Sequence, residues 1–413
     1  MKTLLFVALS VIVISTQAAS LPETPGLLPT PVVLPLLEQD PGVAAARAGL
    51  EVARQEAGIL DRSPYEWNAK VSGQRRSLQS GPRYQEWNVG IERTLRLPGK
   101  ATADRNIGNA TVEESEARYG DAIHEAAREL LTLWLDWLHA DNAYSLAKAN
   151  GQSAQGNLDA VQKRTRAGDA AKLDVSLAQA ELAEQRRLAN EAKTQASVTW
   201  ARLHARFPGF NRQFMVMPTA LPIEQNVKFW RERILGQSDE LKTAEALLRR
   251  ATAQADRARA DKTPDPTIGA YTASEVGGRE RITGISISIP FPGGQRNERA
   301  IQAVHGAEVK RQDAERVRRQ LEADIDSNVA TAEGTYESMQ IAETGAAAMQ
   351  DNAKLMQRAY LLGEADLQAL LTARRQATAA GQNALAARTA ALKGYYLLLI
   401  DAHLVWGLDH DAN

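Results

Sequence analysis

The chain has 413 residues, no cysteine and a formal net charge of −1, with charged residues at 24% and aromatic residues at 5%. The lack of cysteine excludes disulfides, thiolate zinc sites, thiol catalysis and a lipidated N-terminal cysteine, and the balanced charge gives no indication of a nucleic-acid partner. Abundant alanine and few large side chains favour long, thin helical packing over a thick globular core.

The first segment, 1–20, has the pattern of a secretory signal peptide. Lys2 precedes the apolar run Leu4–Ile14, and small residues follow up to a predicted cleavage near Ala18. An N-terminal membrane anchor is the alternative, although the run is short for the ~30 Å of hydrocarbon in a bilayer. No later apolar stretch has the length of a membrane helix, so a membrane location would require strands.

In chain order, the sequence predicts the same series of elements twice: a helix, two strands, a very long helix, a glycine and another helix. The first series is Gly42–Leu60, 65–75, 86–97, Lys100–Ala167, Gly168 and a helix that ends near Arg206. The second series is Asp239–Asp261, Thr267–Glu275, 283–291, Gln295–Leu362, Gly363 and a last helix. Pro208, Pro218 and Pro222 interrupt the chain between the two series.

Two landmarks indicate that the repetition is an internal duplication. Leu-Pro-Gly-Lys at 97–100 and Phe-Pro-Gly-Gly at 291–294 each join a strand to a long helix, and Gly168 and Gly363 follow them at spacings that agree to within one residue. The predicted organisation is a signal peptide at 1–20, a first structural repeat at 21–210 and a second structural repeat at 211–413.

The predicted strands alternate between apolar and polar residues, which gives a sheet one apolar and one wet face. In 65–75, for example, Trp67, Ala69 and Val71 alternate with Asn68 and Lys70. The aromatic residues suit either the girdles of a membrane interface or a soluble core; they are Tyr65, Trp67, Trp87 and Tyr271. Four strands cannot close a membrane barrel, because the smallest have about eight, so a membrane role forces oligomerisation, and three chains would supply twelve strands.

Each long helix lacks proline and would extend on the order of 100 Å, so it must pack along partners for its whole length. The two shorter helices of each half would lie end to end along it. Glycines in the first long helix, at 108, 120, 151 and 156, predict local breaks. Gly168 fits the end of a helix, where positive φ is needed, and Asp169 would cap the next helix. Gly363 and Glu364 repeat this arrangement.

The duplicated order, the two Pro-Gly joints and the two glycine hairpins resemble the TolC-type outer membrane efflux family over essentially the whole mature chain. The joints and the chain length look closer to its CzcC-like heavy-metal branch. The resemblance implies a homotrimer with a twelve-stranded β-barrel in the outer membrane and a long α-helical barrel in the periplasm. It also implies a periplasmic adaptor and an inner-membrane RND pump as partners, with divalent heavy-metal cations among the candidate substrates.

The same resemblance implies that the two glycine hairpins are periplasmic tips that meet the adaptor. The tip residues are Arg164, Ala167, Gly168, Asp169, Leu173, Tyr360, Leu362, Gly363, Glu364 and Leu367. Some members of the family close the periplasmic mouth with acidic side chains after the second tip glycine. The candidate gate residues here are Asp174, Glu364 and Asp366, and a ring of carboxylates from three chains would favour cations.

The sequence gives no sign of an enzyme, because it has no Gly-rich phosphate loop, no Gly-x-Ser-x-Gly elbow and no His-Glu-x-x-His helix. The histidines are scattered, at 124, 139, 204, 305, 403 and 410, so we expect no resident metal and no cofactor. The competing hypothesis is a soluble periplasmic coiled-coil adaptor or scaffold. Adaptors usually have one helical hairpin per chain, so the two predicted here favour the duct.

Overall fold

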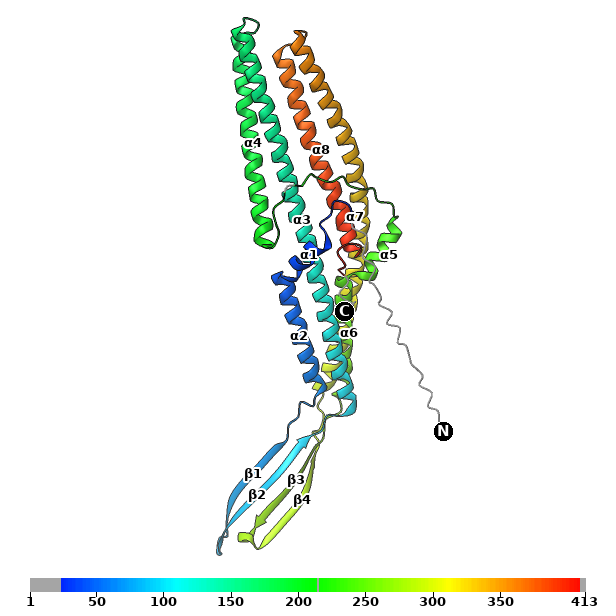
Figure 1. Cartoon of the computed structure of the whole chain (residues 1–413). Coiled ribbons are helices and arrows are strands. Elements are labelled where there is room, and N and C mark those ends of the chain that lie inside the picture. The colour runs from blue at the N-terminus through cyan, green and yellow to red at the C-terminus, as the bar shows by residue number, and fades with distance from the viewer. Residues whose placement is uncertain (1–23, 214, 409–413) are drawn as a thin grey trace, which may run out of the picture.

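The structure is a computed structural model that describes residues 24–213 and 215–408. The predicted signal peptide at 1–20 and His410 lie outside the described residues. The described chain is elongated, with a small sheet at one end and two helical hairpins at the other (Figure 1).

The elements follow the predicted order, and two short helices are added. The helices are α1 Thr30–Glu38, α2 Pro41–Asp61, α3 Pro98–Arg166, α4 Lys172–Arg206, α5 Val227–Gln237, α6 Asp239–Ala260, α7 Gln295–Leu362 and α8 Leu367–Asp401. The strands are β1 Asn68–Ser77, β2 Arg83–Thr94, β3 Thr267–Glu275 and β4 Glu280–Ser288. The predicted class, mainly helical with a small β part, is confirmed.

The four strands form one antiparallel sheet in the order β1-β2-β3-β4. Two strands end earlier than their alternation predicts. β2 stops at Thr94 because Leu97 is already the N-cap of α3 and Pro98 its first residue. β4 stops at Ser288 because Pro290 and Pro292 cannot donate hydrogen bonds to a neighbouring strand. The outer strands β1 and β4 each have one edge without a partner strand in the described chain.

The helices form two long hairpins that lie side by side. α2 and α4 follow one another along α3, and α6 and α8 do the same along α7, as Figure 1 shows. The predicted end-to-end arrangement is therefore confirmed. The predicted breaks are wrong, because α3 runs unbroken for 69 residues. Gly108 instead allows α2 to approach, since a Cβ there would lie 3.0 Å from the Ala57 Cα.

The main core lies about half-way along the hairpins. Trp134 and Trp137 of α3 are fully buried there, and Leu392 and Tyr396 of α8 belong to the same cluster. The sequence analysis did not predict α1 and α5, which contribute to this core. α1 is difficult to recognise because Pro35 lies inside it. The core fixes the two hairpins at their middle, well away from the tips.

No helix in the described part of the chain combines the length and the apolar character that crossing a membrane requires.

Candidate functional site

The two faces of the sheet differ in chemistry. Residues that pair across neighbouring strands lie on the same face, and this places Val71, Val89, Ile91 and Ile285 on one face. All four side chains are exposed in the single chain. Such a continuous apolar surface usually marks contact with another protein or with lipid.

The opposite face is polar. Lys70 forms an ion pair with Glu92 at 2.6 Å, and Arg76 lies 3.0 Å from both Glu86 and Glu275. Tyr271 shares this polar face by the strand register, whereas Trp87 lies on the apolar one. Tyr271 therefore cannot belong to an apolar aromatic girdle with Trp87, and that part of the sequence interpretation is wrong. The sheet has one face suited to water and one suited to an apolar environment.

The joint between sheet and helices is an ion-pair network around the buried Lys100. Its ammonium group lies 3.2 Å from Asp261 and 3.1 Å from Asp265. The Asp265 carboxylate also accepts hydrogen bonds from the Tyr65 hydroxyl at 2.8 Å and the Leu97 N–H at 3.1 Å. Burial alone would raise the pKa of Asp265, but these bonds and the charge of Lys100 together lower it. The Leu-Pro-Gly-Lys motif thus fixes how the first long helix leaves the sheet.

Both hairpin tips have the same backbone geometry. Gly168 has φ of +88°, its N–H donates to the Thr165 carbonyl at 3.1 Å, and the Asp169 N–H donates to the Arg164 carbonyl at 2.9 Å. This pair of hydrogen bonds is a Schellman motif. Gly363, with φ of +78°, ends α7 with the equivalent pair. The prediction that both glycines sit at helix ends with positive φ is confirmed.

The residue after each tip glycine does not cap the next helix, so the roles predicted for Asp169 and Glu364 are wrong. Two residues follow each tip glycine before the next N-cap, which is Ala171 for α4 and Asp366 for α8. The Asp174 carboxylate instead accepts a hydrogen bond from the Ala171 N–H at 3.3 Å, and the Asp366 carboxylate accepts one from the third residue of α8 at 2.7 Å. Two of the three candidate gate carboxylates therefore stabilise helix starts.

The tip residues divide into an exposed set and a buried set. Tyr360 is 5% exposed and Leu367 2%, and the Arg164 guanidinium lies over the Tyr360 ring at 4.9 Å from its centroid. Leu362 is 75% exposed and Leu173 66%. The other tip residues are exposed or half-buried; they are Ala167, Gly168, Asp169, Asp174, Gly363, Glu364 and Asp366. The tips therefore combine three exposed leucines, at 173, 361 and 362, with the buried side chains of Tyr360 and Leu367.

The model of the family described as outer membrane efflux protein matches residues 34–206 and 230–395, which is most of the chain. The chain belongs to the outer membrane efflux protein family. It is accordingly an outer-membrane protein with a large periplasmic helical part. The family match therefore argues against the competing hypothesis of a soluble periplasmic adaptor or scaffold. No curated protein matches the chain.

Solved structures of outer-membrane channels have the same fold. The channel OprN superposes with a TM-score of 0.75 at 19% identity, over 91% of each chain. CusC superposes with a TM-score of 0.73 at 17% identity, and the match covers 90% of this chain and 91% of CusC. CmeC of Campylobacter jejuni superposes with a TM-score of 0.71 at 16% identity, and the match covers 92% of this chain and 85% of CmeC. These proteins are described as channels, and at such identities the likeness extends to the fold alone.

In this efflux-family chain, the two hairpins enclose a cleft below the tips. The cleft has a volume of about 680 Å³ and is bounded by α3, α4, α7 and α8. At its wall, Glu181 of α4 forms an ion pair with Arg375 of α8 at 2.7 Å, and Arg374 donates to Gln357 of α7. The Glu181–Arg375 pair joins the two hairpins, whereas the Arg374–Gln357 bond lies within the second one. Nearer the tips, a buried apolar cluster that includes Leu158 and Leu370 also joins the hairpins.

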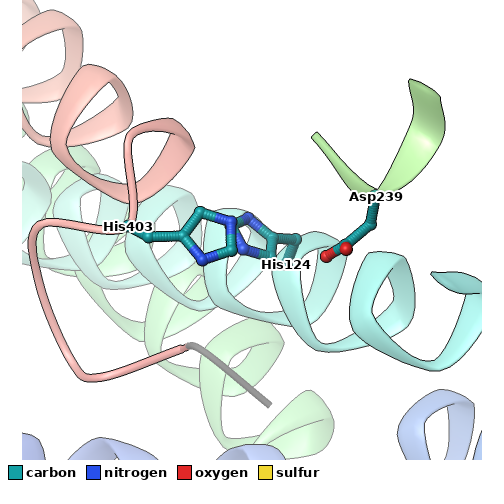
Figure 2. A group of neighbouring side chains, drawn as sticks. All are labelled: His124, Asp239 and His403. Carbon is teal, nitrogen blue, oxygen red and sulfur yellow. The ribbon is translucent and has the colours of Figure 1, made fainter. Parts of the chain in front are cut away.

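The structure brings together one side-chain cluster that the sequence analysis missed. His124 of α3, Asp239 of α6 and His403, which follows α8, converge near the middle of the efflux-family chain (Figure 2). No local pattern in the sequence marks this cluster, because the three residues come from widely separated segments. The other described histidines do not join them: His139 contacts Thr389, and His204 stacks on Trp200.

Proposed function

We propose that the chain forms a passive trimeric export duct of a tripartite efflux system. In this proposal the sheets of three chains close into a twelve-stranded barrel in the outer membrane. The hairpins form a periplasmic tube that receives its cargo from an inner-membrane RND pump through a periplasmic adaptor. The protein itself uses no fuel and performs no chemistry.

The observation that carries the proposal is the sheet with two different faces and two open edges. An open edge cannot remain in hydrocarbon, because its N–H and C=O groups would have no hydrogen-bond partners. Closure with copies of the same sheet satisfies both edges. The strand directions are compatible with this, because β1 and β4 run antiparallel in a four-stranded antiparallel sheet. The apolar face of Val71 and Ile285 would then meet lipid, and the Lys70–Glu92 face would line water.

At the other end of the molecule, we propose that the tips meet the adaptor. Leu173 and Leu362, together with the neighbouring Leu361, are exposed apolar side chains there, and Glu364 is an exposed acidic one. The buried Tyr360 and Leu367 would not contact the adaptor themselves but would keep the tip rigid. Asp174, Glu364 and Asp366 of three chains would place a ring of carboxylates around the periplasmic mouth, which favours cations.

For the cargo, we propose divalent heavy-metal cations, as the likeness of the Pro-Gly joints to the CzcC-like branch suggests. We also propose that the two series of elements descend from one duplicated unit, with repeats at 21–210 and 211–413 behind a signal peptide at 1–20. A strain that lacks this protein should become sensitive to divalent metals, and the sensitivity should return to normal on complementation. Sensitivity to organic compounds alone would contradict the metal cargo and leave the duct intact.

Cysteine cross-linking tests the closed sheet directly, because the natural chain has no cysteine to interfere. Val71→Cys on β1 is combined in turn with Thr283→Cys, Ile285→Cys or Ile287→Cys on β4, all on the apolar face. At least one pair should give covalent dimers and trimers under oxidation in outer membranes, while the single variants give at most dimers. If none of the pairs cross-links, the chains do not close through these edges.

A further inference from the structure

Three buried side chains near the middle of the molecule have the composition of a metal site. His124, Asp239 and His403 are 5%, 4% and 3% exposed. One potential ligand atom from each lies within 4.8 Å of the other two, and the two imidazole rings are 4.1 Å apart between centroids. Figure 2 shows the Asp239 carboxylate directed toward His124, with the His403 ring on the other side.

Two imidazoles and one carboxylate form a ligand set that Zn²⁺ and related divalent first-row metals accept. Metal–ligand bonds of roughly 2.1 Å require ligand atoms about 3.4 Å apart in a tetrahedron. The three ligand atoms lie within 4.8 Å of one another, so metal binding requires these separations to shorten by up to roughly 1.4 Å.

The backbone at His403 supplies a second, independent observation. His403 has φ of +53°, its N–H donates to the Ile400 carbonyl at 2.9 Å, and the Leu404 N–H donates to the Leu399 carbonyl at 2.9 Å. This is the same Schellman motif that ends α3 and α7, where the positive-φ residue is glycine. Left-handed backbone is unfavourable for an L-residue other than glycine, and such strain tends to persist where a side chain has a role.

The surroundings leave space for an ion and carry suitable charge. A small cavity of about 40 Å³ adjoins the cluster, which exceeds the roughly 15 Å³ that one water needs. Asp121, Glu240 and Asp401 also line it, together with Arg128. Lys242 lies 3.2 Å from the Asp239 carboxylate, so its ammonium group would compete with a metal for this ligand.

We propose that His124, Asp239 and His403 bind one divalent transition-metal ion of the zinc type, with water as the remaining ligand. The ion joins α3, the start of α6 and the end of α8, three segments that are far apart in the chain. Because the site is buried at its three ligands, the ion is resident and structural, and it is distinct from any cargo that passes along the duct. The segment it holds continues to Trp406, whose indole N–H donates to the Leu28 carbonyl at 2.8 Å.

Zinc titration of the metal-free protein tests the site. The full mature chain is purified in detergent without a histidine tag, stripped with a chelator and titrated with Zn²⁺ by calorimetry, with bound zinc counted by elemental analysis. We expect one Zn²⁺ per chain. Asp239→Asn and His124→Ala should each weaken binding by at least about 100-fold, given that loss of even an outer-shell partner costs roughly 10–100-fold. His305→Ala, which removes an exposed histidine of α7, is the matched control and should bind as the natural protein does.

His403→Gly separates loss of the ligand from misfolding. Glycine is the residue that this backbone position prefers, so the variant should fold and unfold near the natural temperature without metal. It should lose the zinc-dependent rise in the unfolding temperature that the natural protein shows. Lys242→Gln should tighten binding, because it removes the competing cation. Equal zinc binding in the natural protein, His403→Gly and Asp239→Asn would overturn the site, and so would an absence of stoichiometric zinc in the natural protein.

Discussion

Replacement of Lys100 by methionine should destabilise the joint between the sheet and the helices. The Lys100 side chain is 2% exposed, and its ammonium group lies between the carboxylates of Asp261 and Asp265. Methionine keeps most of the side-chain volume, so the change removes the charge with little loss of packing. It leaves the buried Asp265 without its cation, although the hydrogen bonds from Tyr65 and Leu97 remain.

Removal of one partner from a buried ion pair costs about 3–5 kcal/mol. The lower end applies here, because Asp265 keeps two hydrogen bonds and the Asp261 side chain is 43% exposed and can turn to water. A loss of about 3 kcal/mol corresponds to a fall of roughly 5 °C in the unfolding temperature. Lys148→Met, at an exposed position of the same helix, is the control and should change the temperature little.

The effect should depend on pH in a defined direction. The pKa of Asp265 is lower in the folded chain than in the unfolded one. Its contribution to stability is therefore present above the unfolded pKa of about 3.9 and is lost as the pH falls through the folded value. The unfolding temperatures of the natural protein and Lys100→Met, measured by far-UV circular dichroism, should differ most near neutral pH. The difference should be smaller below about pH 4. An equal difference at both pH values would refute the ion-pair account of the joint.

Three further substitutions test other parts of the structure. Gly363→Val places a β-branched residue at φ +78°, a backbone strain of about 1–3 kcal/mol. It should impair export while the trimer stays intact. Loss of the trimer on gels would instead make this glycine a determinant of assembly. Glu181→Gln removes the ion pair with Arg375. The closed channel should then leak more current in planar bilayers. Unchanged conductance would contradict a role for this ion pair in holding the hairpins together. Trp134→Ala should cost about 3–5 kcal/mol and lower the thermal midpoint, and an equal effect from the exposed Trp67→Ala would contradict the position of the core.

Periodicity and turn chemistry made much of the fold predictable from sequence. The absence of proline over 100–167 predicts the long α3, and the glycines at 168 and 363 predict the two turns because only positive φ closes them in this way. The alternation of Val71 with Lys70 predicts the two faces of the sheet. These features depend on neighbours in the chain, so the sequence alone contains them.

Features that depend on tertiary packing were not predictable in the same way. Glycine lowers helix propensity, yet Gly108 lies inside an unbroken helix because it gives α2 room to approach. The caps at Asp174 and Asp366 were misassigned because the length of each turn beyond its glycine has no sequence signature. His124, Asp239 and His403 become neighbours only when three distant segments meet, and no spacing in the sequence anticipates this.

The most direct test of the trimeric duct is the assembly state of the mature protein in the outer membrane. Outer membranes are solubilised in mild detergent, the mass of the protein–detergent complex is measured by light scattering, and gels are run with and without boiling. We expect a complex of three chains that boiling converts to a single chain, somewhat lighter than the 45.0 kDa of the full sequence because the signal peptide is removed. A protein that leaves the outer membrane fraction as a monomer or dimer would contradict the closed barrel and the duct that depends on it.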